Sequence, residues 1–111
     1  MGDPNAFKSV VTPWVPTSDP IELAILGKLQ EELAELQGIV ARIIIQGIDE
    51  VEPVTKVPNR VALQHEVADV YATLSVTVSQ YRLNPNEITE RVTAKIAHLY
   101  KWHELLREAL R

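Results

Sequence analysis

Cysteine is absent from the sequence, which excludes disulfides, thiolate nucleophiles and cysteine-ligated metals. Positive charge is scarce as well. The 11 lysines and arginines stand against 15 acidic residues, giving a formal net charge of −4. A protein that binds the nucleic-acid backbone normally presents a basic face, so this balance argues against a nucleic-acid partner. A nucleotide ligand is still compatible with it, because a bound cation can reverse the local charge.

Long hydrophobic runs are also missing. No stretch is long and apolar enough to span a membrane, and the first residues hold no apolar core of a secretion signal. We therefore expect a cytoplasmic protein with no membrane partner. The 111 residues suffice for one domain, and an apolar content of 46% allows a core. A domain this small gains from oligomerisation, because alone it buries a modest fraction of its surface.

Proline separates an N-terminal segment from the rest of the chain. Four of the seven prolines lie within residues 1–20, a density that favours extended, irregular backbone. The same segment contains Phe7 and Trp14, which indicates that part of it packs on another surface. We predict an extended segment at residues 1–19 and a single helical domain at residues 20–111.

The start and end of the first helix are marked by cap residues. Asp19 is a good N-cap, Pro20 suits the first helical position, and Glu22 completes a pattern similar to a capping box. Leucines and isoleucines then recur at helical spacing until Gly47, a plausible end. Two prolines within residues 47–59 predict a loop there.

Two further helices are predicted. Asn59 is a plausible cap for a helix that runs to about Arg82. This segment is rich in Val and Thr, which favour strands, but it is too long for an ordinary strand. Asn84 followed by Pro85 marks the start of a last helix that runs to near Arg111. The fold class is therefore all-α.

Acidic side chains recur at helical spacing on the first two helices. Glu32 and Glu35 lie three residues apart, with Glu31 beside them, and Glu66 and Asp69 repeat that spacing on the second helix. Side chains three apart share one face of a helix, one turn from each other.

The second acidic pair is the more informative. Between Val61 and Tyr81, Glu66 and Asp69 are the only formally charged side chains, so this helix should be buried around much of its circumference. Two like charges about 5 Å apart repel by about 3 kcal/mol at an effective dielectric of about 20. Converging carboxylates therefore need protons or cations, and few basic residues lie nearby. A divalent cation satisfies this requirement.

The ligand type narrows the choice of metal. Carboxylate oxygens suit Mg²⁺, Mn²⁺ or Ca²⁺. None of the three histidines has a glutamate three residues before it, so the signature of a di-iron carboxylate bundle is missing. Mg²⁺ held by carboxylates usually takes substrate phosphates as further ligands, which indicates phosphoryl or pyrophosphoryl chemistry. A glycine-rich phosphate loop is absent from the sequence.

The two acidic motifs resemble the signature of the MazG-like superfamily of all-α nucleoside triphosphate pyrophosphohydrolases. The resemblance rests on Glu31-Glu32-Leu33-Ala34-Glu35 followed by Glu66-Val67-Ala68-Asp69, and it covers roughly residues 20–100. It implies hydrolysis of a nucleoside triphosphate to the monophosphate and diphosphate. It also implies Mg²⁺ or Mn²⁺ as cofactor, held by the residues Glu32, Glu35, Glu66 and Asp69. Glu31 would then help to bind a further metal or orient the attacking water.

Four residues are candidates for binding the substrate. The resemblance implies a phosphate-binding lysine on the last helix, for which Lys95 is the candidate, with Arg91 behind it. Lys28 lies one turn before Glu32, so it either contacts phosphate or pairs with the neighbouring acids. Trp14 either stacks on a base as part of an N-terminal lid or packs against the bundle.

The resemblance also implies an oligomer. Members form dimers, or tetramers made of dimers, which fits an antiparallel bundle of about three helices per chain completed by a partner chain. As a whole, the short chain is similar to phage members of the superfamily, which implies dGTP as a purine substrate in phage nucleotide metabolism and a place in the host cytoplasm. Two alternatives stay open: a non-catalytic helical dimerisation module, and a pyrophosphohydrolase of another phosphorylated compound.

Overall fold

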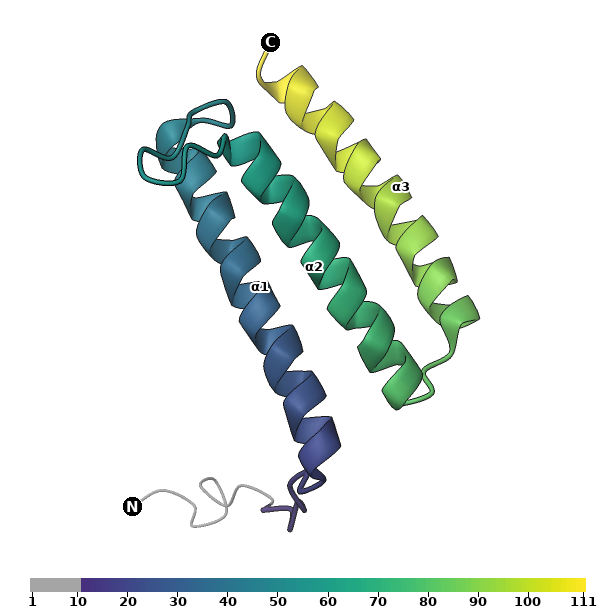
Figure 1. The fold of residues 1–111 in the computed structure, drawn as a ribbon. Helices are drawn as coiled ribbons and strands as arrows, with labels where there is room; N and C mark the ends of the chain where they lie inside the picture. The colour runs from purple at the N-terminus through teal and green to yellow at the C-terminus, as the bar shows by residue number, and fades with distance from the viewer. Residues whose placement is uncertain (1–10) are drawn as a thin grey trace, which may run out of the picture.

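Three helices make up most of the described chain (Figure 1). The computed structural model describes residues 11–111. Helix α1 spans Pro20–Gln46, α2 spans Asn59–Gln80 and α3 spans Pro85–Ala109. Residues 11–19 have no regular secondary structure, and residues 11–111 contain no strand beyond one isolated bridge. The all-α prediction is confirmed, and the Val- and Thr-rich segment is a helix despite its strand propensity.

Both ends of α1 form as the cap residues predict. The Asp19 carboxylate accepts hydrogen bonds from the backbone N–H groups of Ile21 at 2.8 Å and Glu22 at 3.3 Å. At the other end Gly47 adopts a φ of 98°, and its N–H donates to the Ile43 carbonyl at 2.8 Å. This left-handed conformation is open to glycine at little cost, so α1 stops there.

The start of α2 differs from the prediction. Asn59 was predicted to cap the helix, but Pro58 occupies the cap position and Asn59 is the first helical residue. Its side chain is fully buried and donates from Nδ2 to the Gln46 side chain at 3.2 Å and to the Gly47 carbonyl at 2.9 Å. Asn59 therefore ties the start of α2 to the end of α1 instead of capping its own helix. The helix also ends at Gln80, slightly before the predicted Arg82.

Helices α1 and α2 pack against each other, whereas α3 stands almost alone. Figure 1 shows α3 beside α2 and antiparallel to it. Within residues 11–111, however, the backbone of α3 comes close to the other helices at very few points. Ile39 and Val70, at the α1–α2 contact, are the only buried hydrophobic side chains in the described chain. α3 contains no buried residue.

Two expectations about burial are not met within one chain. Helix α2 was expected to be buried around much of its circumference, but Tyr71 is 70% exposed and Val76 is 53% exposed. The N-terminal segment was expected to pack in part on another surface, but its Trp14 is 85% exposed. Phe7 lies outside the described residues. Within residues 11–111, no helix combines the length and hydropathy that crossing a bilayer requires.

Candidate metal site

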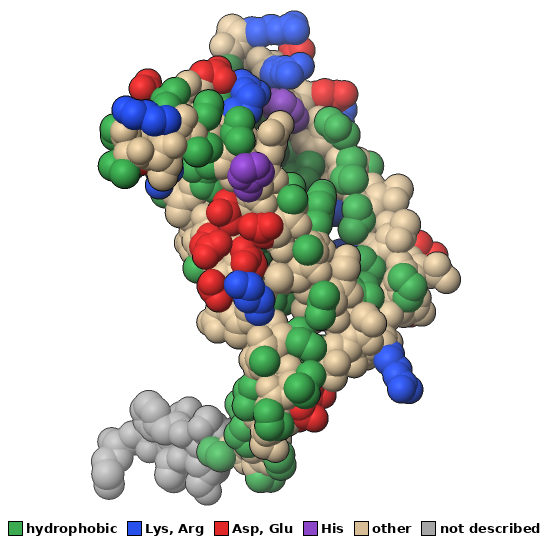
Figure 2. Space-filling model, in the orientation of Figure 1, with side chains coloured by type: hydrophobic (Ala, Val, Ile, Leu, Met, Phe, Trp, Pro, Cys, Tyr) green, Lys and Arg blue, Asp and Glu red, His purple; other side chains and the backbone are tan. Residues whose placement is uncertain are grey.

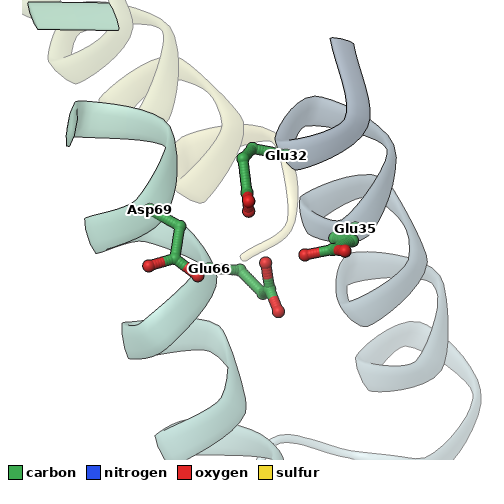
Figure 3. Close-up of side chains that lie close together, drawn as sticks. All are labelled: Glu32, Glu35, Glu66 and Asp69. Atoms are coloured by element: carbon green, nitrogen blue, oxygen red, sulfur yellow. The ribbon is translucent and has the colours of Figure 1, made fainter. Parts of the chain in front are cut away.

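Four carboxylates from α1 and α2 meet where the two helices pack. These residues, called the acidic cluster below, are Glu32, Glu35, Glu66 and Asp69. One carboxylate oxygen from each lies within 4.8 Å of all the others, and Figure 3 shows the side chains turned toward one another. The three-residue spacing puts each pair on one helix face, and the α1–α2 contact joins those faces. The four residues are the ones predicted from the sequence.

Two oxygens of the acidic cluster are buried without a hydrogen-bond partner. Glu32 is only 6% exposed, and its Oε2 has no partner among the residues described. Oε2 of Glu66 is likewise buried and has no hydrogen-bond partner among the described residues. A buried carboxylate oxygen without a partner costs free energy, and native proteins seldom leave one in that state. Both oxygens are therefore ready to bind a cation or a proton donor.

The acidic cluster is also electrostatically crowded. The negative charge of Glu32, followed by partial desolvation, raises the pKa of Glu35 above its ordinary value, and Glu66 adds to the rise. Lys28 offsets part of the repulsion, because its Nζ lies 3.3 Å from Oε1 of Glu32. Figure 2 shows the acidic side chains as one patch with a basic side chain beside it. All-oxygen ligands from two rigid helices fit a divalent cation such as Mg²⁺ or Mn²⁺.

Glu31 lies just outside the acidic cluster. Its side chain is 56% exposed and pairs with Lys28 at 3.4 Å. It still contributes to the rise in the pKa of Glu35, so it lies within electrostatic reach. Lys28 thus bridges Glu31 and the buried Glu32, and its own pKa is raised, chiefly by the hydrogen bond to Glu32.

The other predicted substrate residues are not brought to the acidic cluster. Arg91 and Lys95, with Ala94 and His98, line a hollow of about 130 Å³ on α3. Among the described residues, no ion pair joins Arg91 or Lys95 to a carboxylate. Trp14 precedes α1 and is mostly exposed. Only Lys28 lies against the acids.

Another hollow lies on α3, away from these carboxylates. Its volume is about 410 Å³, and every residue lining it belongs to α3: Ile96, Leu99, Tyr100, Trp102, His103 and Leu106. Because a single helix cannot enclose a cavity, this hollow marks an apolar helix face that the rest of the described chain leaves uncovered.

Comparison with models of known protein families, with curated proteins and with solved structures gives no match. The resemblance of the acidic motifs to the MazG-like superfamily therefore stays a hypothesis. The geometry by itself shows that residues 11–111 are all-helical and that four carboxylates lie close enough together to share a cation.

Proposed function

We propose that this chain is a metal-dependent nucleoside triphosphate pyrophosphohydrolase, which converts a (d)NTP and water to the (d)NMP and diphosphate. The convergence of the acidic cluster is the observation that carries the proposal. Two of its buried oxygens have no partner among the described residues, and a divalent cation would supply one. A solvated acidic surface, as expected for a simple dimerisation module, would not bury Glu32.

The residues have separate roles in this proposal. The four side chains of the acidic cluster hold Mg²⁺ or Mn²⁺, which when bound neutralises phosphate charge and favours attack by water on phosphorus. Lys28 lies at the edge of the cluster and binds a phosphate oxygen of the substrate. Glu31, exposed beside it, orients the attacking water or helps to hold a second metal ion. Placement on two packed helices keeps these groups at fixed distances.

The substrate class follows from the resemblance. We infer a purine nucleoside triphosphate, with dGTP as the first candidate and phage nucleotide metabolism as the setting. Arg91 and Lys95 enter the site in this proposal only through a partner chain, since α3 does not carry them to the acids of its own chain. Trp14 remains a candidate for stacking on the base.

The working unit in this proposal is a homodimer, or a tetramer of dimers. Two buried hydrophobic side chains make a very small core for the described residues. The described residues leave the apolar face of helix α3 uncovered, and a second copy of the chain would bury Leu99 and Leu106 there. Apolar area of this kind stabilises a fold only when it is removed from water.

A thermal shift and a product assay test the function. Millimolar Mn²⁺ or Mg²⁺ should raise the melting temperature, since binding at 100 times Kd adds about 2.7 kcal/mol. With Mn²⁺, dGTP should yield dGMP and diphosphate. Release of orthophosphate, or no product from any common NTP or dNTP, would contradict the proposal. A product from another phosphorylated compound alone would support the open alternative instead.

Conservative variants separate metal binding from folding. Glu66→Gln and Asp69→Asn remove one charge each, so both should keep the helical fold and lose the Mn²⁺-induced shift and turnover. Glu90→Gln is the matched control, because Glu90 is exposed on α3 and forms none of the ion pairs seen in the described chain. Wild-type turnover in either cluster variant would overturn the site assignment.

A further inference from the structure

A shallow apolar groove continues the seam between α1 and α2 beyond the acidic cluster. It has a volume of about 220 Å³, and its lining residues are Ala24, Ile25, Lys28, Thr73 and Val76. Lys28 lies one turn before Glu32 on α1, and Thr73 lies one turn after Asp69 on α2. The acidic cluster and this α1–α2 groove are therefore neighbours along one helix–helix contact.

The groove is apolar along its walls and charged at one end. Lys28 stands at that end, with Nζ bound to Glu32 of the acidic cluster. Thr73 supplies a hydroxyl that donates to the backbone carbonyls of Asp69 at 2.9 Å and Val70 at 3.1 Å. Since its one proton is used there, the Thr73 oxygen remains free to accept a hydrogen bond from a ligand.

We propose that the α1–α2 groove is the subsite for the heterocyclic base of a nucleotide whose phosphates lie at Lys28 and the acidic cluster. This inference rests on the proposed function and deepens it. A nucleotide has an anionic end and a flat base whose faces are apolar, which matches a groove that is apolar at Ala24 and cationic at Lys28. Ligand pockets are typically apolar with a few placed polar groups, as here.

The dimensions favour a base over a second copy of the chain. Ala24 and Glu32 are eight residues apart on α1, about 12 Å along the helix axis. That length leaves room for a sugar between a base in the groove and phosphates at the acids. A packed helix would need a long apolar face, whereas this groove ends at an ion pair after about one turn.

The test compares a nucleotide with a probe that has no base. Titration calorimetry with Mn²⁺ present measures the Kd of the full chain for dGTP, supplied as an analogue with a non-hydrolysable bridge between its α and β phosphates, and for inorganic tripolyphosphate. Ala24→Phe fills the groove and should weaken dGTP binding at least tenfold while leaving the tripolyphosphate Kd unchanged. Ala41→Phe is the matched control on the exposed surface of α1 and should change neither Kd.

A second, milder variant guards against misfolding. Thr73→Val keeps the side-chain shape and removes the acceptor, so it should weaken dGTP binding several-fold and spare tripolyphosphate. Unchanged dGTP binding in both variants would overturn the subsite. So would an equal loss for both ligands, or a change of oligomeric state in sedimentation, which would identify the groove as a contact between copies.

Failure of the two proposals can be told apart. If the wild-type chain binds Mn²⁺ and tripolyphosphate but gains nothing from the base of dGTP, the subsite is refuted and the metal site stands. If the wild-type chain does not bind Mn²⁺ at all, the proposed function is refuted and the subsite with it.

Discussion

Lys28 holds its ammonium group 3.3 Å from the buried carboxylate of Glu32, one turn further along α1. This ion pair places one fixed positive charge beside the acidic cluster. A lysine cannot satisfy the remaining oxygens, since Oε2 of Glu32 keeps no partner in the described chain. Lys28 would therefore compete with a bound metal ion for Glu32, and it leaves most of the cluster's charge uncompensated.

Replacing Lys28 with methionine should strengthen metal binding and weaken catalysis. The variant removes a cation that repels the incoming metal, so the Kd for Mn²⁺ should fall several-fold. The same variant loses a phosphate contact, so KM for dGTP should rise. Both constants can be obtained from calorimetry and steady-state kinetics on one preparation.

Lys28→Arg is the control for this prediction. It keeps the charge, so its Kd for Mn²⁺ should stay near the wild-type value. The prediction is wrong if the methionine variant binds Mn²⁺ more weakly than wild type, because Lys28 would then support the metal ligands rather than compete with the ion.

Local sequence signals predicted the helices and the acidic cluster well. Asp19, Gly47 and Asn84 form hydrogen bonds with residues two to four positions away in the sequence, so a local sequence pattern is enough to predict them. The helical spacing of the acids fixes which face each pair occupies. Their meeting in space required only that α1 and α2 pack side by side, as consecutive helices usually do.

Features that depend on longer-range contacts were not predictable. Asn59 is a residue type that often caps helices, but here its side chain donates a hydrogen bond to the Gly47 carbonyl and so joins the ends of two helices. The α1–α2 groove is lined mainly by apolar residues, whose pattern is the same as that of a core. Helical periodicity predicts that α3 forms, but it does not predict where α3 packs. The sequence pattern therefore did not place Arg91 or Lys95 relative to the acids.

The loop between α1 and α2 should loosen in acid. The N–H of Thr55 and that of Val54 donate to the Glu52 carboxylate and lower its pKa; Arg60 lowers the pKa of Asp49 through its hydrogen bonds. A carboxylate with a lowered folded-state pKa contributes stability above its ordinary pKa and loses it as the pH falls. The contribution of Glu52 should therefore decline as the pH drops below 4.5, its ordinary value.

Amide hydrogen exchange checks this pH dependence. Protection factors at Val54 and Thr55 should be lower at pH 4 than at pH 6, after correction for intrinsic exchange rates. Glu52→Gln should show the low protection at both pH values, because it cannot ionise. Equal protection of the wild-type amides at the two pH values would show that the carboxylate does not hold the loop.

Removing the Asn59 side chain should destabilise the junction between α1 and α2. Asn59→Ala leaves the Gly47 carbonyl and the Gln46 side chain without their donor, and it opens space at a fully buried position. A lost buried hydrogen bond that leaves a partner unsatisfied costs about 1–3 kcal/mol. Urea unfolding should show a loss in this range.

Asn86→Ala is the control for the Asn59 variant. The Asn86 side chain is exposed at the start of α3. The hydrogen bond that Asn86 donates to Oδ1 of Asn84 comes from its backbone N–H, which the alanine variant keeps. Its free energy of unfolding should stay within about 0.5 kcal/mol of wild type. If Asn59→Ala costs no more than this control, the buried amide does not stabilise the junction.

The apolar face of α3 should be the surface that joins two copies of the chain. Leu99 and Trp102 are 48% and 60% exposed in one chain, on a helix without buried residues. Leu99→Glu places a charge in the proposed interface, where its desolvation is unfavourable. Sedimentation should show a dimer or tetramer for wild type and a shift toward monomer for the variant, with at least a tenfold weaker dimer.

Lys101→Ala tests whether that shift is specific to the apolar face. Lys101 is exposed on the same helix and pairs with Glu104 at 3.6 Å, a surface ion pair that contributes little to stability. This variant should keep the wild-type oligomer. A wild-type chain that sediments as a monomer at all concentrations would refute the interface. Since a monomer would leave Leu99 and Leu106 in water, it would also require another partner to cover α3.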